Sequence, residues 1–143
     1  MMKSVVFFIT VLFFSPLVWS LETIKIGMTT ALTGPAAELG LNMRMGIDCY
    51  FDIVNKQGGI AGKKLELVVL DDGYEPERAA LNMRKLIDQD KVLAVIGNVG
   101  TPTAIVTVPI AQDKKTLLFA AFSGGDILRP NPASRYVVNY RPS

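Results

Sequence analysis

VLAVIGNVGTPT, residues 92–103, indicates the fold more clearly than any other stretch of this sequence. Residues 92–96 are all apolar and do not alternate with polar residues, a pattern typical of a short strand buried on both faces. Gly97, Asn98 and Gly100 interrupt the run, and Thr101-Pro102 then resembles a helix start, with an N-cap hydroxyl followed by proline. The stretch predicts a strand, a tight loop and the first turn of a helix.

Thr101 has two interpretations at this point. Its hydroxyl can cap its own helix, which is the common role of threonine in such a place. Alternatively, the free N–H groups of the first helical turn can bind an anionic or acceptor group of a small ligand. The local sequence alone favours the capping role.

Residues 1–20 are predicted to be a signal peptide. Lys3 gives a positive start, residues 5–14 form an apolar core, and Val18 and Ser20 occupy the small-residue positions before cleavage ahead of Leu21. The apolar run is too short to span a bilayer comfortably, so no stable membrane insertion is expected after cleavage. The mature chain, 21–143, is expected to be exported and soluble in the periplasm.

The composition narrows the classes of function. The chain has 143 residues, half of them hydrophobic, which suits a single α/β domain. A net charge of +2 gives no indication of nucleic acid as a partner. The sequence has no histidine and a single cysteine, Cys49, which excludes His-dependent triads, His or Cys-cluster metal sites and an internal disulfide. We expect neither a metal nor a cofactor.

The remaining pattern alternates strands and helices. Strands are predicted at 24–30, 65–70, 92–96, 116–121 and 136–140, with an amphipathic helix over 43–54, a second from Pro76 and a third over 101–112. Gly46 and Cys49, both small, are expected to pack closely against the sheet, and Pro109 is expected to kink or shorten the third helix.

This order predicts an α/β fold with a doubly wound, mostly parallel sheet in the strand order 2-1-3-4-5. A ligand would bind beyond the carboxyl ends of the strands, where the first and third strands diverge. The loops at 30–39, 97–101 and 122–125 reach that crevice, and they are rich in Gly, Ser, Thr or Pro rather than in charge.

Asp71-Asp72 is the pair that suggests an enzyme, since adjacent carboxylates at a strand end can hold Mg²⁺ or share a proton. A phosphoacceptor domain would also need an aspartate where this chain has Asn98. A solvated turn in which one carboxylate caps the next segment is the favoured interpretation. No GxGxxG, Walker loop or nucleophile elbow follows a strand, and Ser123 has no histidine to activate it. These observations favour binding of a small polar ligand over catalysis.

Five motifs in order resemble the periplasmic type 1 solute-binding proteins, closest to those of branched-chain amino acid (Leu/Ile/Val-binding-like) ABC transporters. They are IKIG, LTGPAAELG, VNKQGGI, GKKLELVVLDDGYEP and VIGNVGTPT, spread over about residues 24–141. The resemblance implies a two-lobed protein that closes on a small ligand and delivers it to permease subunits of an ABC transporter. This chain would supply the N-terminal lobe, as a truncated form with weak or no binding of its own.

The resemblance also implies binding residues. Thr101, preceded by Gly100, matches the residue whose side chain and amide bind the ligand carboxylate, and Phe122 would offer its carbonyl to the ligand ammonium. Ser123 or Gly124 would supply the next donor, and Leu39 matches an often aromatic position that leans over the ligand.

Two departures from the family pattern bear on specificity. Ser123-Gly124 stands where Ala-Thr is common, and Leu39 replaces an aromatic residue, so an amide, a urea-like compound or an aromatic acid is conceivable instead of an amino acid. An exported module that senses amino acids or amides is the alternative function, and a Mg²⁺-dependent enzyme is the least favoured.

Overall fold

The computed structural model describes residues 22–142, so the predicted signal peptide at 1–20 lies outside the described residues. No helix in this range is long and apolar enough to cross a membrane. The elements in chain order are β1 (Thr23–Thr30), α1 (Ala37–Lys56), β2 (Lys64–Asp71), α2 (Pro76–Asp88), β3 (Ala94–Ile96), α3 (Thr101–Asp113), β4 (Leu117–Phe119), the short 3₁₀ helix η1 (Asp126–Leu128) and β5 (Val137–Val138).

The sheet has the strand order β2-β1-β3-β4-β5, and every neighbouring pair is parallel, as predicted. β1 and β2 pair along their full length, from Thr23 opposite Lys64 to Thr30 opposite Asp71. The two longest strands therefore end together, and they place the loop after β1 beside Asp71 and Asp72. The short strands β3, β4 and β5 extend the sheet to the other side of β1.

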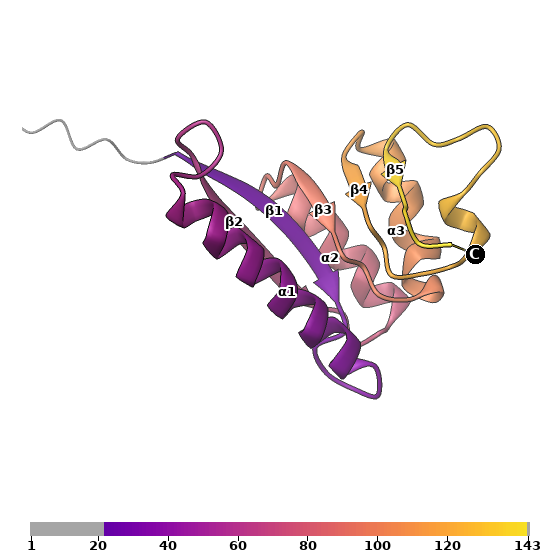
Figure 1. Cartoon of the computed structure of the whole chain (residues 1–143). Helices are drawn as coiled ribbons and strands as arrows, with labels where there is room; N and C mark the ends of the chain where they lie inside the picture. The colour runs from indigo at the N-terminus through magenta and orange to yellow at the C-terminus, as the bar shows by residue number, and fades with distance from the viewer. Residues whose placement is uncertain (1–21, 143) are drawn as a thin grey trace, which may run out of the picture.

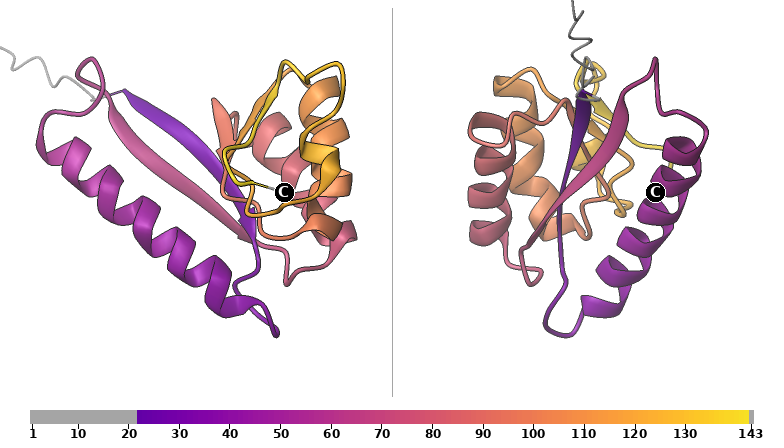
Figure 2. Two further views of the ribbon diagram at one scale, coloured as in Figure 1. Left: turned by 45° about the vertical axis from the view of Figure 1, so that its right-hand side comes forward. Right: turned by 90° about the vertical axis from the view of Figure 1, so that its left-hand side faces the viewer.

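The helices cover the sheet unequally. α1 lies on one face, and α2 and α3 lie side by side on the other, as the right-hand view of Figure 2 shows. The core lies mainly between the sheet and the α2–α3 layer. Its buried members are Met83, Leu86, Val92, Val95, Ala104, Val108, Ile110, Ala111, Leu118, Ala121, Leu128 and Val137.

The prediction that residues 92–96 form a strand buried on both faces is wrong. β3 is shorter, Ala94–Ile96, and Leu93 is 69% exposed. β4 likewise alternates, because Leu118 is fully buried while Leu117 and Phe119 on either side are 38% and 39% exposed. The reason is that α1 packs mainly against β2 and reaches β3 only in part, so the part of this face formed by β4 and β5 is left uncovered among the described residues (Figure 1).

Two expectations about the helices are also corrected. Gly46 and Cys49 do not pack against the sheet, because both lie on the exposed side of α1. Pro109 does not shorten α3, which continues to Asp113. Ile105, whose carbonyl loses its helical partner to the proline, is on the solvent side of the helix together with Pro109, so water can hydrate that carbonyl.

Candidate functional site

A cleft of about 290 Å³ opens where the chain leaves the carboxyl ends of β3 and β4. This is the edge at which ligands bind in open α/β sheets. The first turn of α1 and the turn after β2 complete its walls. The residues that line it are Leu39, Tyr74, Val99, Gly100, Thr101, Phe122, Ser123, Gly124 and Arg141.

All six residues predicted from the sequence line this single cleft, although they come from three separate segments. The structure adds Tyr74, Val99 and Arg141, which sequence reasoning missed. Val99 lies within the predicted loop. Tyr74 follows the Asp71-Asp72-Gly73 turn, and Arg141 follows the fifth strand. The turns that contain Tyr74 and Arg141 could be recognised from the sequence. Nothing in the neighbouring residues indicates, however, that these two side chains approach the loops after β3 and β4.

The hydroxyls of Thr101 and Ser123 join the two central loops. Their oxygens are 2.7 Å apart, and Ser123 Oγ also accepts a hydrogen bond of 3.0 Å from the Gly125 N–H. Thr101 is the first residue of α3 rather than its N-cap, which is Gly100, and it makes no side-chain capping bond. The capping interpretation of Thr101 is therefore wrong, because its hydroxyl is directed across the cleft floor to the loop after β4.

Backbone groups of the same loops form a short extension of the sheet. The Gly100 N–H donates to the Phe122 carbonyl over 3.2 Å, and the Phe122 N–H donates to the Asn98 carbonyl over 2.7 Å. The carbonyl expected to bind a ligand ammonium thus accepts one bond and keeps one lone pair. In contrast, within residues 22–142 the N–H groups of Thr101 and Gly124 donate to no protein acceptor. The backbone of the cleft therefore offers two free N–H donors to a ligand.

The side chain of Asn98 stabilises this arrangement through hydrogen bonds. Its side chain is fully buried, and its amide nitrogen lies 3.4 Å from the Thr29 carbonyl at the end of β1. Its amide oxygen accepts from the hydroxyl of Thr103 over 3.3 Å. Asn98 therefore connects β1, the loop after β3 and the first turn of α3 through one satisfied polar side chain.

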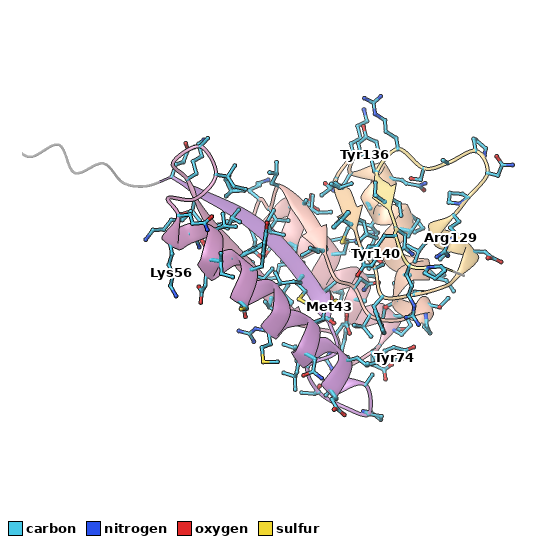
Figure 3. All side chains as sticks on the ribbon, viewed as in Figure 1. Met43, Lys56, Tyr74, Arg129, Tyr136 and Tyr140 are labelled. Carbon is cyan, nitrogen blue, oxygen red and sulfur yellow. The ribbon has the colours of Figure 1, made fainter. Side chains whose placement is uncertain are left out.

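Tyr74 forms one wall of the cleft, near the end of β1 (Figure 3). Its backbone has a φ of 69°, unusual for a residue other than glycine, and its N–H donates to Asp72 Oδ1 over 2.9 Å. The ring lies against Gly100, so closely that a Cβ atom added to this glycine would be 2.2 Å from Tyr74 Cε2. Gly100 is therefore required to be small as well as to have a positive φ.

The two adjacent aspartates have different structural roles. Asp71 accepts hydrogen bonds from the N–H groups of Leu32, Thr33 and Gly73, from the Thr33 hydroxyl and from Arg78. Desolvation raises its pKa, but these hydrogen bonds outweigh that effect and hold the pKa of Asp71 well below its usual value. The turn thereby fastens the loop after β1 to the end of β2.

Asp72 is fully buried, so the expected solvated turn is wrong for this residue. Burial raises the pKa of Asp72, and hydrogen bonds from the Tyr74 N–H and the Thr29 hydroxyl offset part of that increase. Both carboxylates are thus engaged in structural hydrogen bonds. Within the described part of the chain, no group of three or more His, Cys, Asp or Glu is placed to hold a metal ion.

A larger hollow of about 840 Å³ lies at the opposite, amino-terminal end of the strands, beside residues such as Thr23, Ala61 and Leu93. It has none of the predicted site residues. Because ligands in this fold class bind at the carboxyl ends of the strands, the smaller cleft is the better candidate site.

Residues 23–143 match a family model described as "Periplasmic binding protein". A leucine-, isoleucine-, valine-, threonine- and alanine-binding protein of Pseudomonas aeruginosa is 33% identical over 97 residues, which make up 68% of this chain and 26% of that protein. A Leu/Ile/Val-binding protein homolog of Brucella melitensis is 29% identical over 125 residues, or 87% of this chain and 33% of that protein. The chain thus spans about a quarter to a third of these curated relatives.

Solved structures agree with this fold. A possible leucine/isoleucine/valine-binding protein from Rhodopirellula baltica has 54% identity and a TM-score of 0.81, over 86% of this chain and 32% of that one. A branched-chain amino acid transporter substrate binding protein from Streptococcus pneumoniae, in complex with isoleucine, has 28% identity and a TM-score of 0.75, over 85% and 34% of the two chains. A solute binding protein of an ABC transporter from Rhodopseudomonas palustris, in complex with 3,4-dihydroxybenzoic acid, has 30% identity and a TM-score of 0.69, over 82% and 31%.

Proposed function

The chain belongs to the periplasmic binding proteins, in the branched-chain amino acid group, and we propose that it forms the first ligand-binding lobe of an exported solute-binding component. In this proposal the lobe binds an amino acid or a related small polar ligand for uptake by an ABC transporter. It acts by binding and release rather than by catalysis, and residues 1–20 direct it to the periplasm.

The observation that carries the proposal is the convergence of the predicted residues on one cleft. Thr101, Ser123 and Gly124 come from two loops, yet their hydroxyls and free N–H groups lie on the same cleft. Hydroxyl and N–H donors at a helix N-terminus suit a carboxylate, the group that all amino acids share.

The affinity of this lobe for such a ligand should be low. The cleft is one open wall of a site, and family members enclose their ligands by closing a second lobe over the first. We therefore expect a dissociation constant of about 1 mM, which corresponds to a binding free energy of about −4 kcal/mol.

The test is a titration of the ¹⁵N-labelled chain with L-leucine, L-isoleucine, L-valine and acetamide, followed by amide chemical shifts. We expect shifts centred on Gly100, Thr101, Ser123 and Gly124. Thr101→Val should weaken binding at least about tenfold, since a hydrogen bond to a charged group is worth roughly 1.5 to 3 kcal/mol. Thr116→Val, at the other end of β4, is the matched control. The absence of shifts with every ligand would refute the proposal.

An exported sensing module is the second candidate function. It is favoured by the likeness to an extracellular ligand-binding receptor from Rhodopseudomonas palustris, with 31% identity and a TM-score of 0.68 over 85% of this chain. A sensor and a transport component would bind ligand at the same cleft, so co-purification of the protein with permease subunits, or with a signalling protein, separates the two.

A further inference from the structure

Arg141 places a positive charge at the rim of the cleft. Its guanidinium carbon lies 4.1 Å from the centre of the Phe122 ring, a cation–π arrangement that holds the side chain over the cleft wall. Its backbone is anchored too, because its N–H donates to Asn139 Oδ1 over 3.3 Å and Asn139 Nδ2 donates to the Ser123 carbonyl over 3.0 Å. Arg141 is therefore attached to the same loop that supplies Ser123.

This charge has no counterpart in the cleft. None of the described residues that line it is an aspartate or a glutamate, and the guanidinium of Arg141 forms no ion pair within residues 22–142. The other polar groups around the cleft are hydroxyls and N–H donors. The carbonyl of Phe122 accepts one bond from the Gly100 N–H, so an ammonium group could use only its second lone pair and would find no carboxylate among the described lining residues.

We propose, on the basis of the binding function above, that Arg141 is a specificity-determining residue and that this lobe selects carboxylates without a neighbouring ammonium group. A guanidinium attracts the carboxylate of such an acid, whereas in a zwitterionic amino acid the attached ammonium is repelled and cancels much of that attraction. The preferred ligand class is therefore a small monocarboxylate with an apolar or flat remainder that can lie against Tyr74 and Phe122.

The test compares three probes that share one carbon skeleton and differ in charge: 4-methylpentanoate, L-leucine and 4-methylpentan-1-amine. Each is titrated into the ¹⁵N-labelled chain, and the dissociation constants are taken from the amide shifts. We expect 4-methylpentanoate to bind about tenfold more tightly than L-leucine, and the amine not to bind, since one charge contact in a partly exposed site is worth on the order of a tenfold change.

Two variants test whether Arg141 causes the preference for 4-methylpentanoate over L-leucine. Arg141→Gln should bring the ratio between 4-methylpentanoate and L-leucine to within about twofold, by weakening the former. Arg135→Gln, an exposed residue on the same segment that does not line the cleft, should leave the ratio unchanged. The dispersion of the amide spectrum reports whether each variant is folded.

The possible outcomes separate the two proposals. If the wild-type chain binds L-leucine as tightly as 4-methylpentanoate, or if Arg141→Gln keeps the wild-type ratio, the inference about Arg141 is overturned while the binding function stands. If none of these probes and none of the amino acids produces shifts, both are refuted.

Discussion

Replacing Gly100 by alanine should destabilise the fold from within the cleft. Gly100 has φ 96° and ψ 154°, a region in which an L-amino acid costs about 1 to 3 kcal/mol. The added Cβ would also lie 2.2 Å from Cε2 and 2.7 Å from the hydroxyl oxygen of Tyr74. Tyr74 is held in place by its bond to the buried Asp72, so overpacking adds about 1 to 3 kcal/mol. The expected loss is roughly 2 to 6 kcal/mol.

The same substitution elsewhere in the chain provides a control of opposite sign. Gly46 lies in the middle of α1 on its exposed side, and a Cβ added there would have no atom within 4 Å. Gly46→Ala should therefore stabilise the chain by about 0.5 to 1 kcal/mol, the difference in helix propensity between the two residues.

The assay is urea unfolding of both variants followed by far-UV circular dichroism, with the free energy taken from the midpoint and slope. The double variant Gly100→Ala with Tyr74→Ala removes the steric conflict, so it should lose less stability than the sum of its single changes. If Gly100→Ala were as stable as the wild-type chain, the argument from backbone conformation and close packing would be refuted. If the double variant showed no such recovery, the conflict would not involve Tyr74.

Three further predictions concern the turn after β2 and the sheet. Asp71→Asn should cost about 2 to 3 kcal/mol near pH 7, because its Nδ2 cannot accept the bonds from the Thr33 hydroxyl and Arg78. Because the pKa of Asp71 is lowered by folding, its contribution to stability is fully present above the unfolded pKa of about 3.9 and is lost as the pH falls toward the folded value. The two urea midpoints should therefore approach each other progressively as the pH falls below about 4. Asp72→Asn should cost about 1 kcal/mol near pH 7, less than Asp71→Asn, because its Nδ2 loses only the bond from the Thr29 hydroxyl and the raised pKa of Asp72 means that burial disfavours its ionised form; a loss equal to that of Asp71→Asn would contradict this. Leu118→Ala should cost about 2 to 5 kcal/mol and Leu117→Ala less than about 1 kcal/mol, and thermal unfolding that ranks them otherwise would contradict the one-sided burial of β4.

Much of the fold could be predicted because its determinants are local. Apolar runs such as 65–70, the glycine loop after residue 96 and the apolar stripe of α1 each indicate their own element, and parallel crossovers then determine the strand order. The place of the candidate site followed from the same reasoning, since loops at the carboxyl ends of parallel strands meet, whereas its individual residues were implied by the family resemblance. What the residues do there remains a proposal.

The errors concern contacts between distant segments. An apolar run such as 92–96 does not reveal which helix covers each face, so the exposure of Leu93 could not be predicted. The approach of Tyr74 to Gly100 joins turns after different strands, and the contact between Thr101 and Ser123 spans 22 positions of the chain. Such contacts depend on the packing of whole elements, which periodicity and turn composition do not encode.

The uncovered face of β4 and β5 has a consequence for how this protein should be handled at the bench. Phe119, Val138 and Tyr140 are 39%, 46% and 74% exposed, and the rings of Phe119 and Tyr140 lie 6.4 Å apart. Dyes such as ANS, whose fluorescence on apolar surface is commonly taken as a sign of a molten globule, should bind this face in the fully native chain. In dye-based melting curves the fluorescence would then be high before heating, and the folded sample would be mistaken for a partly unfolded one. Cooperative loss of the near-UV signal of the tyrosines is therefore the criterion by which preparations of this protein should be judged.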